Sequence, residues 1–339
     1  MKVINYTPAY KEKLRNFIRN HFSKQPDVYL DYRLEQITES DEDISYNIIV
    51  LNDNDDVIGC NLFFSTKAII NGIEQRIYWS HNTLIDDNYR GDAGTNLVLA
   101  IMEKKHFGIS LSKYSKKYYK IFKSTFFSKA HIYYFMNIWV IKDMIDFLLR
   151  RNHTKSFIFP NEVLVNKCFF ERIKKSTELK ISNNGYWWKD ELDIDFIRDD
   201  KFLSHRFFEN FNTYYFYKLE QKDDKAMDEC YFVVRPIIWR KFNILSVVDF
   251  RCNLKNKKQL KLLLNAINQI AKKNHMGLMI MRTNLLIPAF YKTSKINFNL
   301  FHPFFISRNE KIDIVASNHY LFANNPTLIV TSADSDGDF

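Results

Sequence analysis

Two parts of the sequence carry the same order of predicted elements: strand, polar loop, helix, strand, helix. In the first part, residues 76–85 predict a strand, and the polar loop 86–94 leads into a helix at 95–103. In the second part, a strand at 242–250 is followed by a polar loop and a helix at 259–272. No repeat is visible in the residues themselves, so we interpret the pattern as duplication of one fold at the level of element order.

The remaining patterns complete a mixed α/β arrangement. Apolar residues at helical spacing predict a helix over 8–22, and an Asn/Asp turn cluster joins two β-rich runs into a hairpin. We expect two tandem domains, 1–150 and 151–339. The further predicted elements are strands at 45–51, 57–64, 107–111, 231–234, 277–281 and 327–331, helices starting at 112 and spanning 285–292, and a strand or buried helix at 130–139.

Composition excludes several classes of protein. Aromatic residues make up 16% of the 339 residues, which is too many for a disordered or low-complexity chain. The most apolar stretch contains Lys142, Asp143 and Asp146, so it does not predict a membrane span. Residues 1–6 lack the apolar core of a signal peptide, and we expect a cytoplasmic protein. The four cysteines have no metal-binding spacing, so no metal site is expected.

The net charge of +10 favours anionic ligands, such as nucleic acid, a membrane surface or a phosphorylated small molecule. The surplus is spread along the chain, so a solvated basic surface explains it equally well. No aromatic signature of a common RNA-binding module is present.

The loop within residues 84–97 has the composition of a phosphate-binding loop. It reads Leu-Ile-Asp-Asp-Asn-Tyr-Arg-Gly-Asp-Ala-Gly-Thr-Asn-Leu and opens a helix. Backbone N–H groups at a helix N-terminus, together with about half a positive charge from the helix dipole, attract anions. Small residues at 91, 93 and 94 would let the backbone approach phosphates closely. The loop therefore predicts a pyrophosphate site.

This stretch resembles the acyl-CoA loop of the Gcn5-related N-acetyltransferases (the GNAT superfamily). Their pattern is an apolar strand end, Tyr-Arg, a loop of the form Arg/Gln-x-x-Gly-x-Gly/Ala, and a helix. Tyr89 and Arg90 match its opening, whereas Ala93 and Thr95 stand where two glycines are expected. The resemblance covers residues 1–140, and the second half is similar to a second copy without the motif.

Two-copy bacterial members of this superfamily include N-acyltransferases that modify nucleotide-linked amino sugars for surface polysaccharides. Residues 333–339 are similar to the tails of those proteins. The resemblance thus implies transfer of an acyl group from acyl-CoA, either acetyl-CoA or a longer or hydroxylated one, to such a sugar in a monomer or homodimer. It implies no membrane partner and disfavours nucleic acid.

The resemblance also implies roles for particular residues. A central strand that splays from its neighbour would expose backbone to the pantetheine arm. His81 would be the base and Tyr119 the acid that protonates the departing thiolate. The alternative for each is a purely structural residue, and Tyr118 is one residue away from the expected position. Alternation would place Trp79, His81 and Thr83 on one face of the strand. Acceptor contacts are expected from Trp79, Asn82 and Thr83, and acyl-CoA contacts from Ile85, Arg90, Gly91, Asp92, Ala93, Gly94 and Thr95.

Two alternatives to this function remain. The acceptor could be a peptide, an aminoacyl group or an antibiotic amine. The altered loop glycines also allow a non-catalytic basic protein that uses a degenerate form of the fold to bind nucleic acid or another partner.

Overall fold

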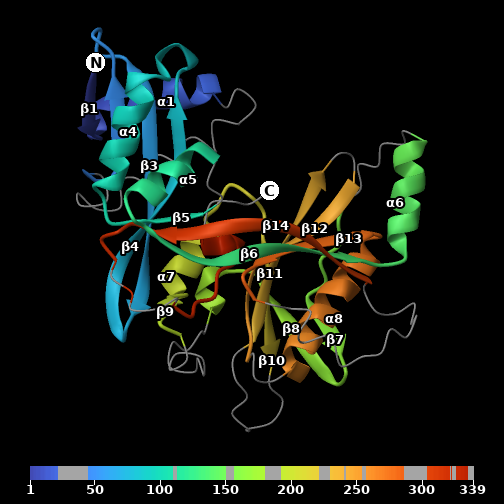
Figure 1. The fold of residues 1–339 in the computed structure, drawn as a ribbon. Coiled ribbons are helices and arrows are strands. Elements are labelled where there is room, and N and C mark those ends of the chain that lie inside the picture. Colours follow the sequence, from blue (N-terminus) through green and yellow to red (C-terminus); the bar gives the residue numbers. More distant parts are fainter. Residues whose placement is uncertain are drawn as a thin grey trace. The chain divides into compact units, whose positions relative to one another are not determined.

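The computed structural model describes residues 1–21, 45–109, 113–149, 156–179, 192–220, 230–239, 242–253, 257–285, 304–320, 322 and 326–334. They form two compact units (Figure 1). Unit 1 contains residues 1–129 and 312–326, and unit 2 contains residues 130–311 and 327–339. The expected border at residue 150 differs from this division, and each unit includes a segment from the other half of the sequence.

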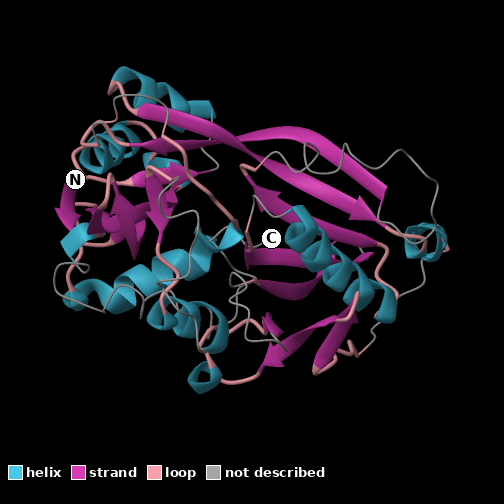
Figure 2. Cartoon of the chain, turned by 90° about the horizontal axis from the view of Figure 1, so that it is seen from below, coloured by secondary structure: helices cyan, strands magenta, loops and turns pink. Residues whose placement is uncertain are grey.

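Unit 1 is a mixed sheet with helices on both faces (Figure 2). Its strands follow the order β1-β2-β3-β4-β5-β14, and only the β4–β5 pair is parallel. Its elements are β1 Lys2–Asn5, α1 Lys11–His21, β2 Ile48–Leu51, β3 Val57–Ile70, β4 Ile73–Ile85, η3 Asp87–Tyr89, α4 Asp92–Met102, β5 Phe107–Ile109, α5 Lys113–Ile121 and the end of β14 Phe304–Ala316, with η1 Pro8–Tyr10 before α1.

Alternation along β2 divides the core of unit 1 into two layers. Ile48 and Val50 pack with α4 on one face of the sheet, and Ile49 and Leu51 pack with α1 on the other. Because both faces are covered, β2 reads as a continuous apolar run rather than an alternating one.

Unit 2 repeats the same order of elements. Strands β10-β11-β12 form an antiparallel meander, and α8 then leads to β13, which pairs parallel with β12. The bounds are β6 Thr125–Met136, α6 Trp139–Leu148, β7 Glu162–Val165, β8 Cys168–Ile173, η4 Ser176–Glu178, β9 Ile194–Phe196, α7 Asp200–Leu203, η5 Ser204–Phe208, β10 Tyr215–Glu220, β11 Tyr231–Trp239, β12 Phe242–Arg251, α8 Lys257–Lys273, β13 Leu278–Thr283 and η6 Ser332–Asp334.

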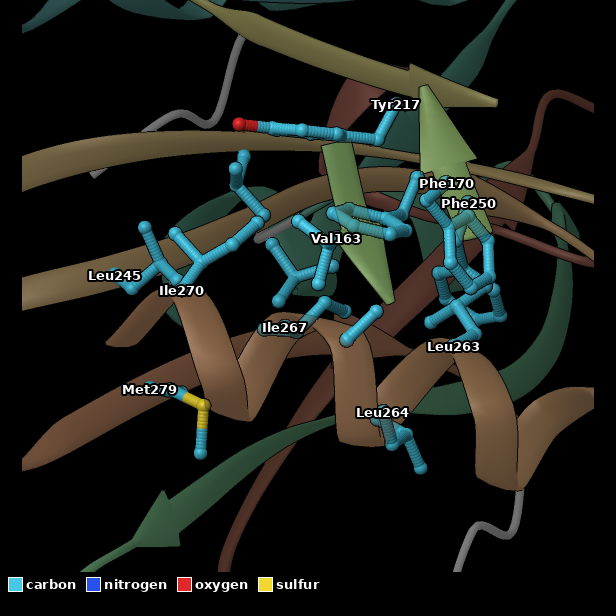
Figure 3. Packing of buried hydrophobic residues seen from close by; sticks show 14 of the residues in the cluster. Val163, Phe170, Tyr217, Leu245, Phe250, Leu263, Leu264, Ile267, Ile270 and Met279 are labelled. Carbon is cyan, nitrogen blue, oxygen red and sulfur yellow. The ribbon is translucent and has the colours of Figure 1, made fainter. Parts of the chain in front are cut away.

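Helix α8 supplies the main core of unit 2. Leu263, Ile267 and Ile270 recur at helical spacing and are almost completely buried. Figure 3 shows them directed from the helix toward side chains of the strands, including Phe170 and Tyr217. Removing one such side chain leaves a cavity that typically costs about 2–5 kcal/mol.

Two strands explain why the units are not contiguous in sequence. Residues 131–136 of β6 pair with β13 in unit 2, although the strand begins in the first half of the chain. Residues 314–316 of β14 pair with β5 in unit 1. Each unit is therefore completed by a strand from the other half.

Most predicted elements are present, and one is corrected. Residues 130–136 belong to strand β6, and helix α6 starts at Trp139. The expected strand at 327–331 is wrong: this segment makes isolated bridges at Leu328 and Thr331, because Ile194 and Thr283 pair with it at separate points. Beyond Leu285 the expected helix 285–292 lies outside the described residues, as do residues 335–339.

Candidate functional site

A cavity of about 890 Å³ lies in unit 1 between strand β4 and helix α4. Residues 80–85 of β4 form one side. Within the described part of the chain the strand pairs with β5 at Trp79 and Ser80 alone, and the next five residues of β4 border the cavity beyond that pairing. The other lining residues are His21, Asp87, Arg90, Gly91, Gly94, Leu97, Val98, Ile101, Met102, Ile109, Ser115 and Tyr119.

Strand β4 carries an irregularity at this cavity. Cys60 pairs with Leu84 but Leu62 pairs with His81, so two residues of β4 oppose one residue of β3. Asn82, within this bulge, has a φ of 49°, in the left-handed region. Its Nδ2 atom is buried and has no hydrogen-bond partner in the part of the chain that is described. A buried donor without a partner is uncommon, and here it marks the irregular part of β4.

Asn61, opposite the bulge on β3, holds it in place. Its Oδ1 accepts hydrogen bonds from the Ser80 hydroxyl at 3.0 Å and the Thr83 hydroxyl at 2.6 Å. Ser80 and Thr83 therefore reach the same partner, which regular alternation does not allow. The expected division of β4 into faces is wrong from Asn82 onward, because the extra residue reverses the alternation.

Helix α4 presents an open N-terminus at the cavity. Its N-cap is Gly91, so no side chain caps the first N–H groups. A methyl group built at Gly91 or Gly94 would meet no protein atom within 4 Å beyond the adjacent residues and the local helix backbone. We call this place, formed by Gly91, Gly94 and the first turn of α4, the cradle. It combines backbone N–H groups that no side chain caps, the positive end of an 11-residue helix, and space that a larger side chain would fill. These features fit the phosphates of acyl-CoA.

The neighbouring residues of this loop divide into two groups. Arg90 is exposed and forms an ion pair of 2.5 Å with Asp87, so its guanidinium borders the cavity from the solvent side. Ala93 is buried in the core, and the Thr95 hydroxyl donates to the Gly91 carbonyl at 3.3 Å. Asp92 occupies the exposed first turn of α4.

Tyr119, on α5, borders the cavity from a buried position. Burial raises the pKa of its hydroxyl well above the usual value of 10, so it is neutral at pH 7. Its oxygen lies 2.7 Å from Nε2 of His106, which is buried directly before β5. Burial also lowers the pKa of His106 to about 4. Both side chains of this pair are uncharged at neutral pH.

The structure brings most of the expected site residues together. Those bordering the cavity are His81, Tyr119, Asn82, Thr83, Ile85, Arg90, Gly91 and Gly94. Trp79, Asp92, Ala93 and Thr95 do not border it. Trp79 packs against Phe107 at the end of the paired region, with ring centroids 5.4 Å apart.

Sequence reasoning missed Asn61, His106 and His21. Asn61 and His106 are buried polar residues in apolar runs, a pattern that signals a hydrogen-bonding role without naming the partner. His21 ends α1 and borders the cavity, with Nδ1 2.9 Å from the Phe17 carbonyl oxygen.

The corresponding place in unit 2 is filled by the protein itself. Strands β12 and β13 pair from Ile244 to Val247, and beyond that point Thr331 bridges β13 at Thr283. The Thr331 hydroxyl donates to Asp249 of β12 at 2.6 Å. Segment 326–334 therefore lies against the ends of both strands.

A buried charge network fixes that segment. Arg198 forms ion pairs with Asp249 at 3.1 Å and with Asp334 at 2.5 Å, and all three side chains are at most 1% exposed. Burial alone would raise the pKa of Asp249, but Arg198 and Arg251 hold it below its usual value. Unit 2 thus has the strand and helix order of unit 1 but a closed cleft.

Within the described residues, no group of three or more His, Cys, Asp or Glu side chains is arranged to hold a metal ion. No helix among them combines the length and apolar character needed to span a membrane.

Comparisons with known proteins identify the fold. No protein-family model matches the sequence, and no curated protein matches it. Among solved structures, a conserved protein of Enterococcus faecalis V583, described as a probable N-acyltransferase, aligns with a TM-score of 0.59 at 8% identity, covering 93% of this chain and 72% of that one.

Two further structures agree. A GCN5-related N-acetyltransferase from Anabaena variabilis ATCC 29413 aligns with a TM-score of 0.54 at 11% identity over 92% of this chain and 72% of its own. An N-myristoyltransferase from Saccharomyces cerevisiae, crystallised with myristoyl-CoA and inhibitors, gives 0.55 at 11% identity over 93% and 80%. The chain has the GNAT fold, and the expected mixed α/β architecture with two tandem copies is confirmed.

Proposed function

We propose that this protein is an acyl-CoA-dependent N-acyltransferase with one active cleft, in unit 1. The observation that carries the proposal is the open cradle at Gly91 and Gly94 beside residues 81–85 of β4, which pair with no described residue of β5. The fold supports it, since similar solved structures include an N-myristoyltransferase with bound myristoyl-CoA.

The cleft offers separate places for the parts of acyl-CoA. The N-terminus of α4 and Arg90 would hold the pyrophosphate, and the backbone of residues 81–85 would pair with the pantetheine arm. Apolar side chains at Leu97, Ile101 and Met102 line the cavity along α4 and would contact the acyl portion.

The reaction forms a C–N bond and breaks the C–S bond of the thioester. Backbone N–H groups at the β4 bulge and the unpartnered Nδ2 of Asn82 would stabilise the negative charge that develops on the carbonyl oxygen. His81 borders the same space and would take the proton released by the amine. A thiol has a pKa near 8.5, so the thiolate is a good leaving group.

For the acceptor we propose the amine of a nucleotide-linked amino sugar, in a cytoplasmic step of surface-polysaccharide synthesis. The net charge of +10 supports an acceptor that carries a diphosphate. The resemblance of the sequence to two-copy N-acyltransferases supports the same class, and residues 1–150 and 151–339 would be the two copies. A peptide, aminoacyl or antibiotic amine is the alternative acceptor.

Two measurements test the proposal. First, thermal unfolding with 1 mM CoA or acetyl-CoA should show clear stabilisation, because a ligand at 100 times its dissociation constant adds about 2.7 kcal/mol. Second, thiol release from acetyl-CoA should be faster with uridine diphosphate glucosamine than with glucosamine, lysine or a peptide that has a free N-terminus. Absence of any stabilisation would overturn the transferase. Equal rates with glucosamine and its nucleotide form would overturn the acceptor class.

A further inference from the structure

The hydrogen bonds around His106 determine where its ring proton lies. Nδ1 is 2.8 Å from the carbonyl oxygen of Lys104, and a carbonyl only accepts. Nδ1 therefore carries the proton. The ring is neutral because burial lowers the pKa of His106 to about 4, so Nε2 has a lone pair and no proton. Nε2 must accept the hydrogen bond from the Tyr119 hydroxyl, 2.7 Å away.

This assignment fixes the hydroxyl of Tyr119 as well. A tyrosine hydroxyl has one proton, and that proton is used in the bond to His106. The oxygen keeps its lone pairs, so it can still accept a hydrogen bond. Tyr119 borders the cavity whereas His106 does not. In this arrangement Tyr119 meets a ligand as an acceptor.

We propose that His106 is a positioning residue that keeps the Tyr119 proton on its own Nε2, so that the Tyr119 oxygen accepts a hydrogen bond from the attacking amine. This inference rests on the proposed acyl transfer. The amine has an N–H to donate and a lone pair that must point at the thioester carbon. The proton released by nitrogen goes to His81 or water, and the thiolate takes its proton from solvent.

The role differs from the acid that the family resemblance implies for Tyr119. To protonate the thiolate, the Tyr119 hydroxyl would have to turn away from His106. That rotation would leave a buried imidazole nitrogen without a partner, which is unfavourable. The structure gives His106 no other side-chain donor among the described residues, so the resting orientation is well defined.

A double-mutant cycle tests the proposal. His106→Met removes the acceptor, Tyr119→Phe removes the hydroxyl, and His106→Gln is the matched variant that keeps an accepting oxygen near the position of Nε2. The assay is thiol release from acetyl-CoA with uridine diphosphate glucosamine as the acceptor. His106→Met and Tyr119→Phe should each raise the acceptor KM on the order of tenfold, the loss of one hydrogen bond. The KM for acetyl-CoA should stay within about twofold.

The two changes should not add, because both remove the same interaction. In the Tyr119→Phe background, His106→Met should have no further effect, and His106→Gln alone should retain activity within about threefold. If the two losses multiply, or if His106→Gln is as impaired as His106→Met, the histidine acts only through packing and the proposal is overturned.

Nitrogen-15 NMR of the histidine side chains, assigned with His106→Gln, gives a test that needs no activity. The expected spectrum of His106 has a protonated Nδ1 and an unprotonated Nε2 at pH 7. A protonated Nε2 would overturn the proposal even in an active enzyme. The expected tautomer in a chain that releases no thiol with any amine would instead overturn the proposed function, and with it the role of His106 toward an acceptor.

Discussion

Replacing Gly94 by alanine separates the stability of unit 1 from its capacity to bind CoA. Apart from its chain neighbours and the backbone of its own helix, the added methyl group would have no protein atom within 4 Å, so the fold accommodates it without a shift. Gly94 is the third residue of α4, and alanine is favoured over glycine in helices by up to about 1 kcal/mol. Without ligand, the variant should be as stable as the wild type or slightly more stable.

The same methyl group would occupy the space that the proposal assigns to the phosphates. At a CoA concentration 100 times the wild-type dissociation constant, the wild type gains about 2.7 kcal/mol. If the methyl weakens binding about 100-fold, the gain falls to about 0.4 kcal/mol by the same relation. For a unit of this size 1 kcal/mol corresponds to about 2–4 °C, so a wild-type shift of about 5–10 °C would shrink to about 1 °C.

The assay is thermal unfolding with and without CoA, and Asn96→Ala is the matched control. Asn96 is exposed on the same helix and does not border the cavity, so its replacement should leave the CoA shift unchanged. The reasoning is refuted if Gly94→Ala loses more than about 1 kcal/mol without ligand. It is refuted equally if the variant keeps the full CoA shift.

Three further predictions concern buried polar groups. Asn61→Leu should lower the free energy of unfolding in urea by about 1–3 kcal/mol, because two hydroxyls at the bulge lose their acceptor, and an unchanged value would contradict the bulge's dependence on it. Asp334→Ala should cost about 3–5 kcal/mol, because it removes one of the two carboxylates paired with the buried Arg198. Asp53→Ala, at an exposed ion pair, should leave the free energy of unfolding almost unchanged. The folded-state pKa of His106, about 4, lies below the unfolded value of 6.5. The free energy of unfolding should therefore fall by about 3 kcal/mol as the pH drops from above 6.5 to 4. In His106→Gln the free energy of unfolding should depend less on pH over this range, and the same pH dependence as in the wild type would contradict the burial.

Much of the fold could be predicted because it depends on local pattern. The apolar spacing of residues 8–22 and the turn cluster between β2 and β3 identified a helix and a hairpin directly. The loop before α4 was recognisable from its small residues, and the structure places Gly91 and Gly94 at the cavity. In these cases the signal lies within a few consecutive residues.

The parts that failed depend on pairing between distant residues. The bulge at Asn82 exists because β3 and β4 pair in shifted register, which no pattern within β4 reveals. Ala93 has the small side chain expected of a loop residue, yet the turn of α4 directs it into the core. The partners Tyr119 and His106 lie on separate elements, and their contact depends on how α5 packs against the sheet.

The exchange of strands sets the order in which the chain can complete its fold during synthesis. In unit 1, β5 pairs with β4 on one side but lacks its neighbour on the other side until residues 314–316 have been made. The His106 backbone N–H likewise lacks its acceptor until the Ser317 hydroxyl is present. Unit 2 closes only when Asp334 reaches Arg198. A ribosome that has translated residue 150 has therefore produced no finished unit, because unit 1 also needs residues 314–316 and unit 2 also needs residue 334.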